Sequence, residues 1–103
     1  MDQHVKEGII DLINRQRKQY KLVDQFYKAA SIEFYELPPH KKADSLIDIV
    51  LDLLGVEKTE DNRHSVGVIM TGASFQVETD GTKVIVDDAE MLVEYLLEKK
   101  KEE

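Results

Sequence analysis

The chain has no cysteine, which excludes disulfide bonds, thiolate nucleophiles and most structural zinc sites. No apolar run reaches the roughly 20 residues that a helix needs to cross a bilayer. The first ten residues, MDQHVKEGII, contain no apolar signal core. We therefore expect a cytoplasmic protein with no membrane contact.

Basic residues are also scarce. Lysine and arginine number 14 against 21 aspartates and glutamates, which gives a formal net charge of −7. The imbalance is concentrated in residues 58–103, which carry 6 basic and 11 acidic residues. A nucleic-acid-binding protein usually presents a basic field, because neutralised phosphates supply much of its affinity. The field of this chain repels DNA and RNA and attracts basic partners, so direct nucleic-acid binding is not expected.

The sequence motifs of common catalytic, nucleotide-binding and zinc sites are missing as well. The sequence contains no G-x-S-x-G elbow, no G-x-x-x-x-G-K-[ST] phosphate loop and no G-x-G-x-x-G fingerprint. None of His4, His40 and His64 has the i+4 partner of a helical zinc site. His64 and Ser65 are neighbours on a predicted strand, where adjacent side chains point to opposite faces and form no nucleophile–base pair. We expect no enzyme activity, no cofactor and no metal site.

What the chain does have is a long helical pattern near its start. Apolar residues keep helical spacing from Val5 to Ala30, and no glycine or proline lies between Ile9 and Leu37. The pattern predicts one helix over about residues 2–33. A helical hairpin broken near residues 18–21 is the competing interpretation, because such a helix is long for a small domain.

One basic cluster, NRQRKQYK at residues 14–21, lies within this helix. At about 100° per residue, its cations fall opposite the apolar stripe. This placement is typical of a solvated face, and the competing interpretation is a contact surface for an acidic partner. A second apolar line follows the basic cluster and consists of Leu22, Phe26 and Ala29. It either is buried by neighbouring elements or faces a partner. The resulting candidate partner-binding surface consists of Arg15, Arg17, Lys18, Leu22 and Phe26.

A second helix is predicted from about residue 39 to residue 54, with Gly55 just past its end. Asp44, Asp48 and Asp52 form an acidic line along it, and like charges at this spacing destabilise a helix. The basic cluster of the first helix is the expected compensation. A divalent cation is the disfavoured alternative, because a single line of carboxylates does not enclose a hard ion.

The second half of the chain has strand character. The segment SVGVIM, residues 65–70, is rich in β-branched residues and contains Gly67, so it predicts a strand, although helical spacing also fits it. Asp80-Gly81 between two runs of strand formers predicts a type I′ hairpin. That loop pairs Thr79 with Thr82, Glu78 with Lys83 in a salt bridge, Val77 with Val84 and Phe75 with Val86. A last helix is then predicted, with Asp87 as its N-cap and Glu90 completing a capping box. Its predicted core face consists of Ala89, Leu92, Val93, Leu96 and Leu97.

Together these patterns predict one α+β domain, with a helical half over residues 1–55 and a hairpin-plus-helix half over residues 64–101. Its antiparallel sheet has two or three strands. The missing chemistry favours a non-enzymatic interaction or regulatory protein that binds a protein partner, with homodimer formation left open.

Two other functions stay open. One is an acidic inhibitor, such as a phage or mobile-element accessory protein, that occupies the nucleic-acid site of a host protein. The other is a winged-helix-like DNA-binding regulator, which the acidic face of the second helix disfavours. The acidic surface of the inhibitor alternative consists of Glu78, Asp80, Asp87, Asp88, Glu90, Glu94 and Glu98.

Overall fold

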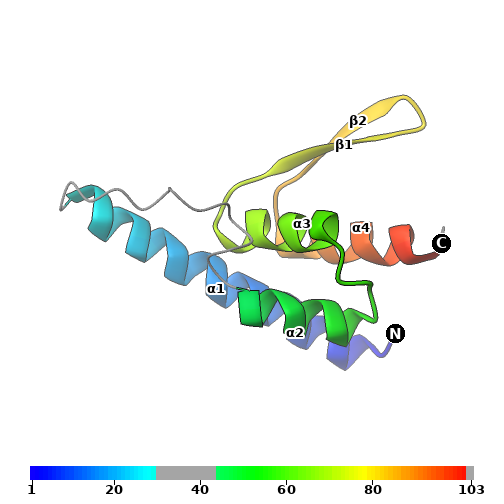
Figure 1. Cartoon of the computed structure of the whole chain (residues 1–103), viewed down its shortest axis with the longest axis horizontal. Coiled ribbons are helices and arrows are strands. Elements are labelled where there is room, and N and C mark those ends of the chain that lie inside the picture. Colours follow the sequence, from blue (N-terminus) through cyan, green and yellow to red (C-terminus); the bar gives the residue numbers. More distant parts are fainter. Residues whose placement is uncertain (30–43, 102–103) are drawn as a thin grey trace.

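The computed structural model describes residues 1–29 and 44–101, with the backbone alone for residues 22–29, 44 and 45. In this part of the chain the helices pack into a body, and a hairpin rises from it above the last two helices (Figure 1). The predicted α+β class is confirmed. The elements follow in the order α1 (Gln3–Ala29), α2 (Asp44–Leu54), α3 (Glu60–Met70), β1 (Phe75–Thr79), β2 (Thr82–Val86) and α4 (Ala89–Lys101).

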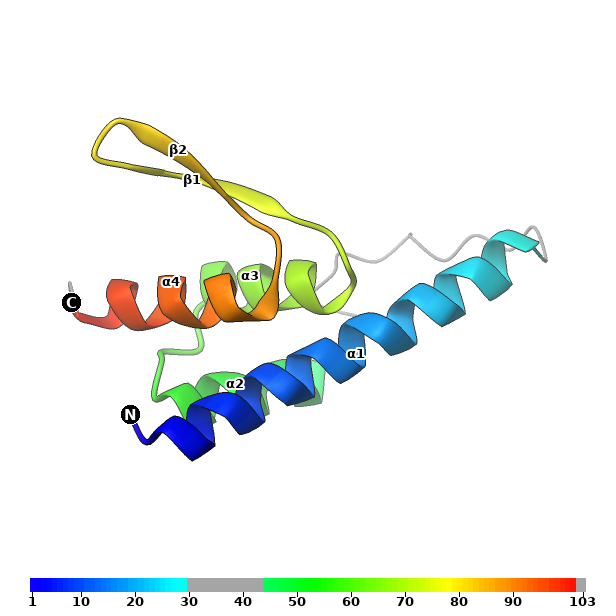
Figure 2. The ribbon, with the colours of Figure 1, turned by 180° about the vertical axis from the view of Figure 1, so that it is seen from behind.

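The first helix, α1, is continuous through residues 18–21, so the helical-hairpin interpretation is wrong. Asp2 caps it, since its Oδ1 accepts a hydrogen bond of 2.8 Å from the backbone N–H of His4. Ile9 and Ile13 are buried between α1 and the other helices. The later turns of α1 extend beyond the ends of the other helices (Figure 2). The helix end predicted near residue 33 lies outside the described residues.

The second helix, α2, ends as predicted at Leu54, and Gly55 follows with a φ of +68° that favours glycine. Val56 N–H donates to the Leu51 carbonyl at 3.0 Å and Gly55 N–H to the Asp52 carbonyl at 3.1 Å. These two bonds form a Schellman motif, which satisfies carbonyls that the helix end would otherwise leave unpaired. The predicted start near residue 39 lies outside the described residues.

The strand predicted over residues 65–70 is wrong, because these residues form the second half of helix α3. Thr59 caps α3 by accepting a hydrogen bond of 3.1 Å from the backbone N–H of Asn62. Every residue from Val66 to Met70 is buried. A helix that is covered on all sides has no polar face, so the apolar pattern of its sequence fits a buried strand as well as a helix.

The hairpin has the predicted register, from Thr79 opposite Thr82 to Phe75 opposite Val86. Asp80 and Gly81 have φ values of 51° and 77°, as a type I′ loop requires. Within the described residues the sheet has two strands. At the base of the hairpin the ring of Phe75 meets that of Tyr95 edge to face, with centroids 5.5 Å apart.

The last helix, α4, has Asp88 as its N-cap and not the predicted Asp87. The Asp88 Oδ1 accepts a hydrogen bond of 2.7 Å from the backbone N–H of Met91, three residues further on as capping geometry requires. Glu90 is therefore one position too early to complete a capping box. The core face of α4 is as predicted, except that Leu97 is half-buried; its buried residues are Ala89, Leu92, Val93 and Leu96.

Candidate functional site

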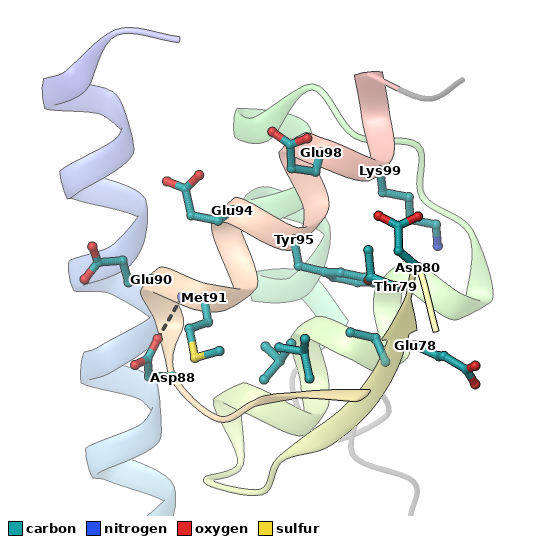
Figure 3. A pocket seen from close by; sticks show the side chains of 13 residues that line it. Glu78, Thr79, Asp80, Asp88, Glu90, Met91, Glu94, Tyr95, Glu98 and Lys99 are labelled. Atoms are coloured by element: carbon teal, nitrogen blue, oxygen red, sulfur yellow. Dashed lines mark hydrogen bonds between the residues drawn. The ribbon is translucent and has the colours of Figure 1, made fainter. Parts of the chain in front are cut away.

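The hairpin and α4 share a base and border an open groove of about 1020 Å³. Figure 3 shows the side chain of Tyr95 reaching from α4 toward Thr79 of the hairpin. The groove forms here because the short turns on either side of the hairpin join it to α3 and α4, while its tip points away from the described helices (Figure 1).

The floor of the groove is apolar. Val77 and Val84 are cross-strand neighbours on the hairpin face that borders the groove. Met91 and Tyr95 lie four residues apart on α4, on a line separate from its buried core face, and both are half-buried. Val86, which is buried, closes the base. The floor can therefore cover apolar side chains that another molecule brings to it.

The rim of this groove is acidic, and we call the whole feature the acidic groove. Three rim carboxylates have partners: Asp88 caps α4, Glu94 pairs with Lys6, and Glu98 pairs with Lys101. Within the described residues, Glu78, Asp80 and Glu90 form no ion pair, and the predicted salt bridge from Glu78 to Lys83 is absent although the two are cross-strand neighbours. The carboxylates of the rim are Glu78, Asp80, Asp88, Glu90, Glu94 and Glu98.

A single cation, Lys99, lines the groove among the described residues. Its Nζ donates a hydrogen bond of 2.9 Å to the Oδ1 of Asn62. Asn62 is only 1 % exposed, and its Nδ2 donates to the Glu57 carbonyl at 2.7 Å. Lys99 thus satisfies a buried amide while the unpaired rim carboxylates keep a negative potential over the groove.

The acidic surface predicted from sequence is largely the rim of this groove. Six of its seven residues line the groove, from the hairpin on one side and α4 on the other. Asp87 is the exception: its carbonyl accepts a hydrogen bond from the guanidinium of Arg17. The floor residues were missed, although Met91 and Tyr95 already showed i, i+4 spacing outside the predicted core face of α4.

The other predicted surface, on α1, is less uniform. Arg15 is exposed and pairs with Asp11 at 2.9 Å, and Lys18 is exposed. Arg17 is half-buried through its bond to Asp87, unlike the solvated side chain that we expected. The side chains of Leu22 and Phe26 lie outside the described residues. The structure therefore describes only the three cations of this predicted surface.

The acidic line on α2 is compensated from a different place than predicted. Asp48 pairs with Arg63 of α3 at 3.0 Å. Asp52 pairs at 2.9 Å with Lys58, which lies in the connector between α2 and α3. The side chain of Asp44 lies outside the described residues. The basic cluster of α1 takes no part in these pairs, because α2 turns its acidic line toward α3.

Chemically, the acidic groove is suited to binding. Among its described lining residues there is no histidine, serine or cysteine that could form a nucleophile–base pair. In the described ranges, 1–29 and 44–101, no group of three or more His, Cys, Asp or Glu side chains could hold a metal ion. Carboxylates around an apolar floor instead match a ligand that carries both cations and apolar groups.

None of the helices in the described ranges is long and apolar enough to cross a membrane. Comparison of the chain with protein-family models, with curated proteins and with solved structures found no match. The geometry of the acidic groove is therefore the basis for assigning a function.

Proposed function

We propose that this protein is a non-enzymatic binding module that holds a basic, partly apolar segment of a partner protein in the acidic groove. The observation that carries this proposal is the composition of the groove, an apolar floor between carboxylates on two separate elements. Lysine or arginine side chains of the segment would meet the rim, and its apolar side chains would cover the floor. The absence of cysteine is consistent with a reducing, cytoplasmic setting.

The charge of the groove decides the sign of the partner. Carboxylates that lie in a concave site focus a negative potential, which raises the local concentration of cationic ligands and repels phosphate. Among the described residues, only two of the six rim carboxylates, Glu94 and Glu98, are paired with a cation. A basic protein segment therefore fits the groove better than a nucleic acid does.

The inhibitor alternative uses some of the same residues differently. To occupy the nucleic-acid site of another protein, the carboxylates would have to project from a convex surface. Glu78 and Asp80, close to the hairpin tip, meet that need, but the other four rim carboxylates follow α4 along the groove (Figure 3). This arrangement favours a protein that binds a basic segment in its groove over one that inserts its own surface into the nucleic-acid site of another protein.

The winged-helix alternative is less favoured still. Helix α3 directly precedes the hairpin and so holds the position of a recognition helix. Its residues from Val66 to Met70 are buried, and its exposed first turn carries Glu60 and Asp61. Of the side chains on α3 that could read bases, Asn62 is buried and Arg63 pairs with Asp48 of α2 at 3.0 Å.

A binding titration with a matched pair of double variants tests the proposal. The probe is a short synthetic peptide of alternating lysine and valine, and the readouts are calorimetry and NMR shifts. Glu78→Lys with Glu90→Lys reverses two unpaired rim charges. Glu7→Lys with Glu57→Lys makes the same change of net charge on exposed residues outside the groove. We expect the groove pair to weaken binding about tenfold, since each reversal replaces attraction by repulsion.

The control pair should weaken binding by no more than about threefold, because distant exposed charges are screened by salt. Equal losses from the two pairs would contradict the proposal, since only the overall charge would then matter. Peptide-induced NMR shifts outside β1, β2 and α4 would contradict it as well.

A further inference from the structure

The open edge of β1 runs along the acidic groove. Val77, Glu78, Thr79 and Asp80 are consecutive, and all four line the groove. Successive side chains of a strand point to opposite faces, so both faces of β1 border it. β2 contributes only Val84 and Val86, which share one face. A strand can border a groove with both of its faces only if its edge points toward that groove. The edge of β1 therefore faces the groove, and the edge of β2 does not.

The backbone groups of this edge can be assigned from the register. In a two-residue hairpin loop the flanking pair, here Thr79 and Thr82, exchanges hydrogen bonds, and bonded pairs alternate along the strands. The backbone N–H and C=O of Gln76 and Glu78 therefore point away from β2. Within the described residues, no hydrogen bond from another element reaches them. As far as the described residues go, the edge is thus a row of donors and acceptors without partners beside the acidic groove.

We propose that the basic segment binds in extended form and pairs with the edge of β1 as a third strand of the sheet. This inference rests on the proposed function, because it concerns the same groove. A third strand would place alternate side chains on two faces. One set would lie over Met91 and Tyr95 and should be apolar. The other set would lie beside Glu78 and should be basic. The recognised segment therefore alternates apolar and basic residues.

A second copy of this chain is a poorer occupant of the edge. Antiparallel pairing of two β1 strands around their centres would bring the Glu78 carboxylates of both copies to the same face of the joined sheet, near each other. Like charges on paired strands oppose such pairing, and charged side chains at an open edge are a known guard against self-association. In Figure 3 the carboxylate of Glu78 points away from Tyr95, where a basic neighbour could meet it.

Proline substitution at equivalent positions of the two edges tests strand pairing. Glu78→Pro removes an outward N–H from β1, and Ile85→Pro removes one from the opposite edge, on β2. Neither position donates within the hairpin, so proline should leave its ladder intact. Glu78→Gln removes the charge alone. With the lysine–valine peptide as probe, we expect about tenfold weaker binding for Glu78→Pro. The losses should be about threefold or less for Glu78→Gln and about twofold or less for Ile85→Pro.

The same peptide with N-methylated backbone amides gives a test on the unaltered protein. It keeps its charge but cannot donate to the edge, so its binding should be about tenfold weaker. The unmethylated peptide should also slow hydrogen exchange at the amides of Gln76 and Glu78. If Glu78→Pro matches Glu78→Gln and N-methylation has no effect, strand pairing is wrong. The acidic groove then still stands, provided that the Glu78→Lys and Glu90→Lys double variant weakens binding. If that double variant binds normally, the proposed function itself fails.

Discussion

The helical body and the hairpin of this protein differ in almost every physical respect. The body buries the apolar faces of four described helices, with α3 covered on all sides along its second half. The hairpin leaves seven of its ten strand residues exposed, including the apolar Val84 and Ile85. Burial supplies stability, whereas open edges and exposed apolar side chains supply contact surface. The comparison assigns stability to the helical body and places the exposed contact surface on the hairpin.

The largest expected effect is on the free energy of unfolding, and it is tested with two isoleucines, one from each region. Ile69 of α3 is 0 % exposed and Ile85 of β2 is 57 % exposed. Truncating a buried isoleucine costs about 2–5 kcal/mol because it leaves a cavity, so we expect Ile69→Ala to lower the free energy of unfolding by that amount. Ile85→Ala should change it by about 0.5 kcal/mol or less. Urea unfolding followed by circular dichroism checks both, and similar losses would break the comparison.

The next effect concerns the hairpin turn. Gly81 has a φ of +77°, where an L residue with a Cβ is strained by about 1–2 kcal/mol. Gly81→Ala should therefore speed hydrogen exchange at the β1 and β2 amides while the urea midpoint of the body stays unchanged. The control is Gly8→Ala, because Gly8 lies within α1 and its added Cβ meets nothing within 4 Å. That change should stabilise the body by about 0.5–1 kcal/mol. A lowered midpoint for Gly81→Ala would show that the regions unfold together.

A third pair of variants sharpens the boundary between the regions. Arg17 donates to the Asp87 carbonyl, just before α4, while Arg15 is exposed and pairs with Asp11 on its own helix. We expect Arg17→Ala to cost about 1 kcal/mol, because a tertiary hydrogen bond is lost. Arg15→Ala should cost no more than about 0.5 kcal/mol. Thermal unfolding of the two variants checks the order, and a reversed order would show that Arg17 does not tie α1 to the hairpin junction.

The smallest expected effect is on the way stability depends on pH. Burial raises the pKa of Tyr20 on α1 above its usual value of 10.0. The unfolded chain then loses this phenol proton at a lower pH than the folded protein. Stability from Tyr20 is complete below about pH 10 and falls as the pH rises toward the folded pKa. Tyr20→Phe should flatten the decline of urea midpoints above pH 10, and an unchanged slope would contradict this.

Sequence patterns predicted the fold wherever local chemistry dominates. The Asp80-Gly81 loop set the hairpin register, and Gly55 marked the end of α2. Helix α3 was missed because its buried half carries β-branched residues on every side, which removes the polar face that identifies a helix. The N-cap at Thr59 was also missed, although threonine is a common residue at helix starts. Tertiary burial, which no local pattern contains, decided between helix and strand.

The site was predictable only in part, for a different reason. The acidic residues of α4 and the hairpin could be counted from the sequence, but not their positions across a groove. That arrangement depends on the angle at which the hairpin leaves the body. The preference for the cations of α1 came from their clustering, which does not distinguish a surface that binds from one that is solvated. The single tertiary bond of Arg17 could not be foreseen.

The register of the hairpin also has a consequence for folding kinetics. The connection between α3 and α4 comprises residues 71–88, a long loop to close between two packed helices. Once the hairpin forms, Phe75 and Val86 are neighbours, and the effective loop is less than half as long. Halving a loop lowers its closure cost by about 0.6 kcal/mol, and hairpins form within about 10 μs. The hairpin, although most of its residues are exposed, can thus speed the assembly of the core by bringing α4 back to α3.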